Sequence, residues 1–368
     1  MENITPEPMH RKTKTIRIVA LVIAVVALVV VAVLYFGSTD AGTSVLSSKE
    51  ERRQAKLAAM DEKRVEGISG EETPTTPGST TTGGSSTTGD TPVVYETGSA
   101  SYEEMYTVKA TKDVVYATIG TTKLAVDIYT PIGVAAPTPA ILYVHGGGFR
   151  GGSKKGVADD AEMLAKHGIA AIAIDYRLSG VAEFPAQIHD VNGAARYVRA
   201  HASEYNIDPN AIFSLGESAG GVLASLLGVS GTALEGTIGG NTSYSSDVAG
   251  VINISGSFMA SIIDTMSGGI KNAISAVVNC TPVPSTACES QYKELSPETY
   301  ISAGDAPFII LHGDKDGSVP TVQAETLHAT LGDTGIPSEI HVAPDLAHVG
   351  GLLSRYLTQV INFVNTNS

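Results

Sequence analysis

The chain has 368 residues, 43% of them hydrophobic, which is enough for one large domain or for a domain with additional segments. Its formal net charge of −14 argues against a nucleic-acid-binding protein, because affinity for a polyanion depends on clustered lysine and arginine. These numbers restrict the class of partner but say nothing about the fold.

A long apolar run without a charged residue lies near the N-terminus, at residues 18–36. As a helix it would span about 28 Å, close to the ~30 Å hydrocarbon core of a bilayer. Basic residues are concentrated between positions 11 and 17, whereas the first cation after the run is Lys49. We therefore expect a transmembrane helix at 18–36, with residues 1–17 in the cytoplasm and the rest of the chain outside the cell membrane. A cleaved signal peptide is the alternative.

Two segments separate this run from the remainder of the chain. Residues 37–66 are juxtamembrane, charged and rich in alanine, and they have the propensity to form a helix. Residues 67–92 consist mainly of threonine, serine, glycine and proline. Such a composition cannot bury enough apolar surface to fold, so we expect a flexible linker that tethers the following domain to the membrane.

Residues 93–368 alternate short apolar runs with segments of helical periodicity. Strands are predicted at 113–118, 123–129, 140–144, 169–174, 211–215, 248–255, 308–311 and 338–342, and helices at 159–167, 185–205, 222–227, 322–334 and 352–363. The first two strands are expected to form a hairpin. The pattern predicts an α/β domain whose mostly parallel sheet carries helices on both faces, with functional groups at the C-terminal ends of the strands.

A Gly-x-Ser-x-Gly sequence, Gly216-Glu-Ser-Ala-Gly220, lies between a predicted strand and a predicted helix. Glycines on both sides of Ser218 permit a turn tight enough to expose its hydroxyl group, as in a nucleophile elbow. The pattern by itself is common in a glycine-rich chain, so its significance depends on the partners of the serine.

A nucleophilic serine needs a base that takes its proton and an acid that orients the base. His348 follows the last predicted strand and is the candidate base, and Asp314 or Asp316, after the preceding strand, is the candidate acid. The spacing alone does not separate the two aspartates. This chain order, with serine first, then the acid and then histidine, is typical of such sheets.

A tetrahedral oxyanion also needs hydrogen-bond donors. Three consecutive glycines follow the strand at 140–144, and we expect the backbone N–H groups of Gly147 and Gly148, together with that of Ala219 after the nucleophile, to provide them. A phosphate-binding loop is the alternative for this glycine run, but such a loop requires Gly-Lys-Ser/Thr or a Gly-x-Gly-x-x-Gly that opens a helix, and the run is followed by neither Gly-Lys-Ser/Thr nor a predicted helix start.

Seven motifs occur along residues 113–363: His145-Gly-Gly-Gly-Phe149, Asp175-Tyr-Arg-Leu178, Phe184-Pro-Ala-Gln187 with Asp190, Asp208-Pro209, Gly216-Glu-Ser-Ala-Gly-Gly221, Ser296-Pro297 and His312-Gly-Asp-Lys-Asp-Gly-Ser-Val-Pro320. In these motifs and in their order, the chain resembles α/β-hydrolase fold esterases of the hormone-sensitive-lipase-like and feruloyl-esterase-like branch. In the family the acid is the fifth residue of the last motif, so the resemblance selects Asp316. It also implies an ester substrate and neither a metal nor a dissociable cofactor.

Residues 256–294 depart from the family pattern, and we expect them to form a small cap or a pocket-lining insertion. They contain both cysteines, Cys280 and Cys288, in one short polar loop. A local disulfide is expected if the domain lies outside the cytosol, and two free thiols are the alternative.

Other polar residues near the motifs are expected to have structural roles. Glu217, beside the nucleophile, is expected to be a hydrogen-bonding neighbour rather than a catalytic group, and His145 to hold the glycine loop in shape. Asp175 and Arg177 are expected to form an ion pair behind the site.

The sequence thus predicts a membrane-tethered, extracytoplasmic serine carboxylesterase in which Ser218, His348 and Asp316 act together. Its substrate is expected to be a small-molecule or carbohydrate-linked ester, with a feruloyl, acetyl or other small acyl group. An amide-cleaving relative and a non-catalytic binding module on a hydrolase scaffold are the alternatives.

Overall fold

The structure is a computed structural model that describes residues 103–368 and, separately along the chain, the two residues 94–95. The predicted segments 1–17, 18–36, 37–66 and 67–92 lie outside the described residues. Among the residues that are described, no helix is both long enough and apolar enough to cross a membrane.

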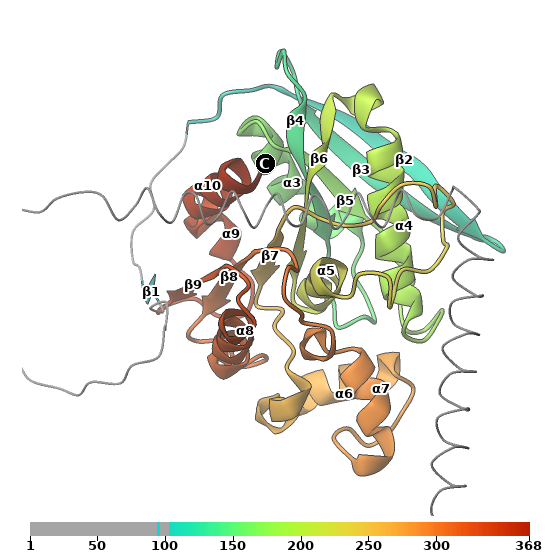
Figure 1. The fold of residues 1–368 in the computed structure, drawn as a ribbon, viewed down its shortest axis with the longest axis vertical. Coiled ribbons are helices and arrows are strands. Elements are labelled where there is room, and N and C mark those ends of the chain that lie inside the picture. The colour runs from blue at the N-terminus through green and yellow to red at the C-terminus, as the bar shows by residue number, and fades with distance from the viewer. Residues whose placement is uncertain (1–93, 96–102) are drawn as a thin grey trace, which may run out of the picture. The chain divides into compact units, whose positions relative to one another are not determined.

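Nine strands in the described part of the chain form a single sheet, in the order β1-β9-β8-β7-β6-β4-β5-β3-β2 (Figure 1). The strands are β1 (Val94–Tyr95), β2 (Val108–Ile119), β3 (Thr122–Pro131), β4 (Thr138–Val144), β5 (Ala170–Ile174), β6 (Ile207–Glu217), β7 (Val251–Ile254), β8 (Phe308–Gly313) and β9 (Ser338–Ala343). Strand β3 pairs antiparallel with β2 and with β5, and all other pairs are parallel. The predicted mostly parallel sheet is therefore confirmed.

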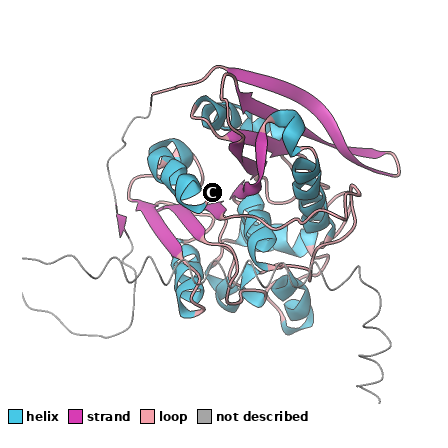
Figure 2. Cartoon of the chain, turned by 45° about the horizontal axis from the view of Figure 1, so that its top comes forward, coloured by secondary structure: helices cyan, strands magenta, loops and turns pink. Residues whose placement is uncertain are grey.

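The predicted N-terminal hairpin is present as β2 and β3 at one edge of the sheet. Its two long strands extend past the neighbouring helices (Figure 2). Gly120 occupies the turn with a φ of 58°, a conformation that glycine adopts without steric cost. Strand β2 begins at Val108, before the predicted start at residue 113. The residues of this first part are exposed or half-buried, so the alternation of buried and exposed side chains does not reveal it.

Helices cover both faces of this sheet (Figure 1). They are α3 (Ala158–Lys166), α4 (Ala186–Ala200), α5 (Ala219–Val229), α6 (Gly268–Val277), α7 (Glu289–Glu294), α8 (Thr321–Asp333), α9 (Leu352–Arg355) and α10 (Leu357–Asn367), with 3-10 turns η1 (Lys154–Val157), η2 (Ala202–Tyr205), η3 (Ala260–Thr265), η4 (Thr286–Cys288) and η5 (Pro297–Thr299). Helices α3 and α10 pack in one core with Ile141 and Tyr143 of β4, whereas α4 and α5 pack in another with Leu142 and Val144. Successive residues of β4 thus enter opposite cores, which explains its continuous apolar sequence.

Two predicted helices are interrupted in the structure. The segment predicted as one helix over 185–205 divides at His201 into α4 and η2. Asn206, the residue that follows η2, has a φ of 54°. The Asn206 side chain donates to the carbonyl oxygens of Val134 and Ala136, and these bonds hold the turn that leads into β6. The closing helix divides at Tyr356 into α9 and α10.

Residues 256–294, the segment expected to be a cap or insertion, lie between β7 and β8 and contain η3, α6, η4 and α7 (Figure 1). The predicted disulfide is present: Cys280 and Cys288 are bonded, with their Cα atoms 5.6 Å apart. It joins the chain just after α6 to η4 and so closes the loop between them.

Candidate active site

Ser218 is the single residue between β6 and α5, and its backbone is strained. Its φ of 51° and ψ of −121° place its backbone in a region that residues other than glycine rarely occupy. A Cβ at Gly216 would lie 2.1 Å from the carbonyl oxygen of Gly220, and a Cβ at Gly220 would lie 2.1 Å from that of Val144. Both positions therefore require glycine, and the geometry is that of a nucleophile elbow.

The structure brings Ser218, His348 and Asp316 into one chain of hydrogen bonds, although they are far apart in sequence. His348, in the loop after β9, has Nε2 2.8 Å from Ser218 Oγ and Nδ1 2.7 Å from Asp316 Oδ2. A carboxylate can only accept, so Nδ1 carries the imidazole proton and Nε2 is left to accept the serine proton. The arrangement can generate a nucleophilic serine.

Asp316 is held in its charged form by the turn after β8. Burial opposes ionisation, but hydrogen bonds from His348 and from the N–H groups of Val319 and Ser318 outweigh it and lower the pKa of Asp316 below its usual value. Asp314, the other candidate acid, lies nearer the surface, where its carboxylate contacts Lys315. Geometry therefore places Asp316, and not Asp314, against His348.

The glycine loop after β4 lies against the elbow. A Cβ at Gly146 would be only 3.3 Å from the Cβ of Ser218. Gly147 and Gly148 have φ values of 117° and 59°, and their N–H groups, like that of Ala219, have no acceptor among the described residues. Unpaired donors beside a serine hydroxyl are what an oxyanion requires.

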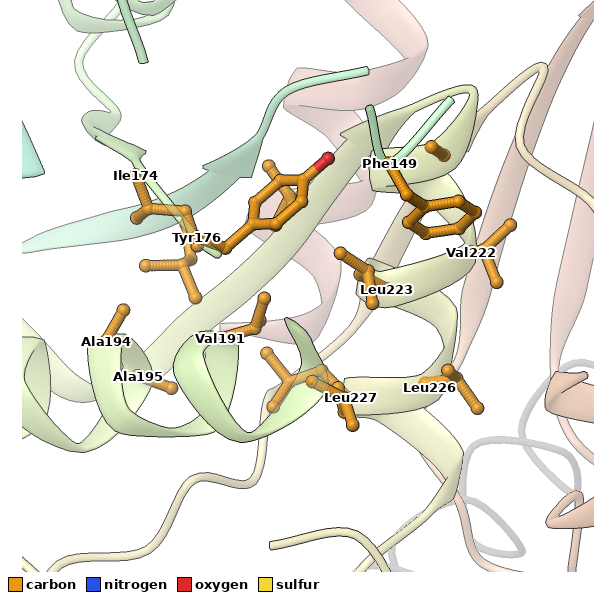
Figure 3. Close-up of a cluster of buried hydrophobic side chains, with 14 of the residues drawn as sticks. Phe149, Ile174, Tyr176, Val191, Ala194, Ala195, Val222, Leu223, Leu226 and Leu227 are labelled. Carbon is orange, nitrogen blue, oxygen red and sulfur yellow. The ribbon is translucent and has the colours of Figure 1, made fainter. Parts of the chain in front are cut away.

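Packing beneath the glycine loop fixes its position. The ring of Phe149 is buried and lies over Val222 and Leu223 of α5 (Figure 3). The His145 ring stacks on Tyr176 at a centroid distance of 4.4 Å, and the Tyr176 hydroxyl donates to the His145 carbonyl oxygen. These contacts are those of a residue that shapes the loop, as expected for His145.

Two cavities meet at Ser218, with Gly148 and Ile270 also lining both. The first, which we call the apolar cavity, leaves about 30 Å³ open to the centre of a water-sized sphere. It is lined by apolar side chains that include Phe149, Val222 and Ile274. The second, which we call the polar cavity because Glu217, Ser218 and His348 lie in its wall, has about 440 Å³ by the same measure. An ester bound at Ser218 would thus have unlike surroundings on its two sides.

The sequence does not reveal the hydrogen bonds that Tyr143 makes with two carboxylates near the nucleophile. The Tyr143 hydroxyl lies 2.8 Å from Glu217 Oε1 and 3.2 Å from Asp160 Oδ2, so Glu217 is a hydrogen-bonding neighbour of the nucleophile as expected, but with partners that the sequence does not reveal. A tyrosine within an otherwise aliphatic buried strand was the available signal.

The expected ion pair between Asp175 and Arg177 is wrong. Arg177 instead forms a double-pronged pair with the fully buried Asp190 of α4, at 2.7 and 2.8 Å, while Asp175 accepts the backbone N–H of Lys154 at 2.9 Å. A buried carboxylate must be paired, so Asp190 is the more demanding partner for the guanidinium.

Among curated proteins, the probable carboxylic ester hydrolase LipM of Mycobacterium tuberculosis is 34% identical over 187 residues, which are 50% of this chain and 43% of LipM. The probable isoprenylcysteine alpha-carbonyl methylesterase ICMEL1 of Arabidopsis thaliana is 26% identical over 225 residues, 58% of this chain and 46% of that protein. The chain thus spans about half the length of the curated relatives it matches.

Solved structures with the same fold are also esterases. A truncated carbohydrate esterase from gut microbiota has a TM-score of 0.64 and 27% identity, and the match covers 72% of this chain and 98% of that one. Esterase 2 of the planctomycete Thermogutta terrifontis has a TM-score of 0.57 and 25% identity, covering 71% and 92%.

The BD-FAE family model matches residues 126–331, more than half of the chain, and this range contains the glycine loop, the nucleophile elbow and Asp316. The chain has the α/β-hydrolase fold and belongs to the BD-FAE family.

Proposed function

We propose that the protein is a serine carboxylesterase that hydrolyses esters of short-chain acids through an acyl-enzyme on Ser218. The observation that carries this proposal is the unbroken hydrogen-bond chain from Asp316 through His348 to Ser218, beside three unpaired backbone donors. The esterase names of the relatives and structural neighbours support the same reaction class.

In the first half of the reaction, Ser218 Oγ attacks the ester carbonyl carbon as its proton moves to His348 Nε2. The N–H groups of Gly147, Gly148 and Ala219 hold the oxyanion, and each such donor typically contributes about 2.7–4 kcal/mol to transition-state stabilisation. The imidazolium then gives the proton to the alcohol oxygen as the C–O bond breaks. In the second half, His348 takes a proton from water as the water oxygen attacks the acyl carbonyl carbon. The imidazolium then returns the proton to Ser218 Oγ as the bond between the acyl carbon and Oγ breaks and the acid is released.

The apolar cavity fits a short acyl chain. One water needs about 10–15 Å³ of volume open to its centre, so about 30 Å³ admits two or three groups of that size beyond the carbonyl carbon. This volume favours an acyl group no longer than butyryl over a feruloyl group with its aromatic ring. Propionate is the group bound in one structure of the Thermogutta esterase, which supports the size estimate.

The experiment is a rate series on p-nitrophenyl esters from two to eight acyl carbons, together with labelling by a fluorophosphonate probe. We expect the highest kcat/KM between two and four carbons, and labelling that the Ser218→Ala variant loses. Covalent modification by tabun of the Thermogutta esterase supports the choice of a phosphorus reagent. A folded but unlabelled wild type would favour a binding module, and turnover of aryl amides without ester turnover would favour an amidase.

The proposal includes a location. We propose that residues 18–36 anchor the chain in the membrane and that the hydrolase domain is extracytoplasmic. The charge asymmetry around this run supports it, as does the Cys280–Cys288 disulfide, because such bonds persist in oxidising compartments. Protease added to intact cells should release the esterase domain, so that its activity is lost from the membrane fraction. Recovery of the whole chain in the soluble cytosolic fraction would contradict the proposal.

A further inference from the structure

The polar cavity has several glycines in its wall. Five of its lining residues are glycines: Gly146, Gly147, Gly148, Gly152 and Gly156. Glycine walls leave room for a bulky occupant and expose amide groups to it. At about 440 Å³ this cavity is far larger than the apolar one, although both reach Ser218. If the acyl group occupies the apolar cavity, the alcohol half of the ester lies in the polar one.

Glu217 is the only carboxylate among the residues that line the polar cavity. Its Oε1 accepts the hydroxyl proton of Tyr143, a fully buried side chain on the neighbouring strand β4. This bond fixes the carboxylate from behind. Its second oxygen, Oε2, has no hydrogen-bond partner in the described chain, so one acceptor of a firmly positioned carboxylate remains available to an occupant of the cavity.

No lysine or arginine neutralises Glu217 within the described residues. Burial raises the pKa of Glu217, and the Asp160 carboxylate adds to this, while the Tyr143 hydrogen bond and His348 act in the opposite direction. A half-buried carboxylate without a cation carries a desolvation cost that a donor from a ligand would offset. Two further serines of the cavity wall, Ser153 and Ser318, can both donate and accept hydrogen bonds.

We propose that Glu217 is a specificity-determining residue that accepts a hydrogen bond from a hydroxyl group on the alcohol half of the substrate. This inference rests on the proposed esterase function. A cationic alcohol such as choline is the other partner that a carboxylate could attract, but recognition of quaternary ammonium groups relies on aromatic faces. The cavity residues include no phenylalanine, tyrosine or tryptophan, so a hydroxyl donor fits better.

The test compares two acetates whose alcohols have the same ring size. Methyl mono-O-acetyl-xylopyranoside offers hydroxyl groups beside the ester, and cyclohexyl acetate offers none. Wild type should hydrolyse the xyloside with the higher kcat/KM. In Glu217→Gln the acceptor becomes neutral, and the ratio of the two kcat/KM values should fall about tenfold, mainly through KM of the xyloside, because a bond to a charged acceptor is roughly twice as strong.

The matched control is Asp160→Asn, which changes the other partner of Tyr143 without changing the cavity wall. Its ratio should stay within about twofold of wild type. If Glu217→Gln slows both acetates in parallel, or if Asp160→Asn shifts the ratio equally, Glu217 acts only through the structure around Ser218 and the proposal is overturned. A wild type that prefers cyclohexyl acetate, or acetylcholine, overturns it without any variant. If the wild-type protein hydrolyses none of these esters, the proposed function itself is contradicted.

Discussion

The carboxylate of Asp316 fixes the proton position on His348, and the substitution Asp316→Asn tests that role. Asp316 Oδ1 accepts the N–H groups of Ser318 and Val319 at 2.8 and 2.9 Å. In the variant these two donors still require an acceptor, so the amide oxygen of asparagine occupies the same place. The amide NH₂ group then faces His348 Nδ1, which must accept, and the imidazole proton moves to Nε2.

That tautomer directs an N–H at Ser218 Oγ and cannot take the serine proton. We expect kcat to fall by about 10⁴, which is about 5.4 kcal/mol at about 1.36 kcal/mol per factor of ten. The residual rate comes from the backbone donors, whose geometry the substitution leaves unchanged. Steady-state hydrolysis of p-nitrophenyl acetate measures the loss, and circular dichroism checks that the variant is folded.

The control for this experiment is Asp314→Asn, which removes a carboxylate of the same loop that contacts only Lys315 at the surface. Its kcat should remain within about twofold of wild type, because exposed ion pairs contribute little. The reasoning fails if Asp316→Asn retains more than about a tenth of the wild-type kcat, or if Asp314→Asn shows the larger loss.

Three further substitutions test the cavities and the loop packing. Ala273→Leu should fill the apolar cavity and lower kcat/KM for p-nitrophenyl butyrate more than for the acetate; equal losses would mean that the acyl chain lies elsewhere. Glu217→Gln should raise the free energy of unfolding, measured by urea titration, at pH 8 but not at pH 4. Burial raises the pKa of Glu217 in the folded protein, so this carboxyl group destabilises the fold increasingly as the pH rises through its folded pKa. Below the unfolded pKa the group is protonated in both states and has no such effect. Phe149→Ala should lower the unfolding free energy by about 3–5 kcal/mol, because it empties the space over Val222 and Leu223, and a loss below about 1 kcal/mol would contradict that packing.

The residues at the ends of strands could be located from the sequence, because a parallel sheet gathers them at one edge. The glycines beside Ser218 indicate a nucleophile elbow only in combination with the acid and histidine loops, and the structure shows that contacts with backbone atoms require both glycines. The choice between Asp314 and Asp316 could not be made from spacing, because both lie in the same short loop after β8. It depends on which side chain the turn directs inward, and three backbone and imidazole donors around Asp316 determine that.

The hydrogen bonds of Glu217 could not be predicted because they depend on strand register. Tyr143 and Glu217 are 74 residues apart in sequence and meet only because β4 and β6 are neighbours with Val144 opposite Gly216. A register shift of one residue would turn Tyr143 to the opposite face of the sheet. The same limitation explains the wrong partner for Arg177, since the sequence does not show that Asp190 of α4 faces it.

In the proposed reaction, the two halves of the ester would contact different parts of the chain. Seven residues of the insertion 256–294 line the apolar cavity, but only Ile270 from this segment reaches the polar one. The wall of the polar cavity comes instead from the glycine loop, from Glu217 and from the loops that carry Asp316 and His348. Substitutions in the insertion can therefore change the acyl preference while leaving alcohol recognition to the hydrolase scaffold. The elbow determines the reaction, and acyl and alcohol specificity are separable on either side of it.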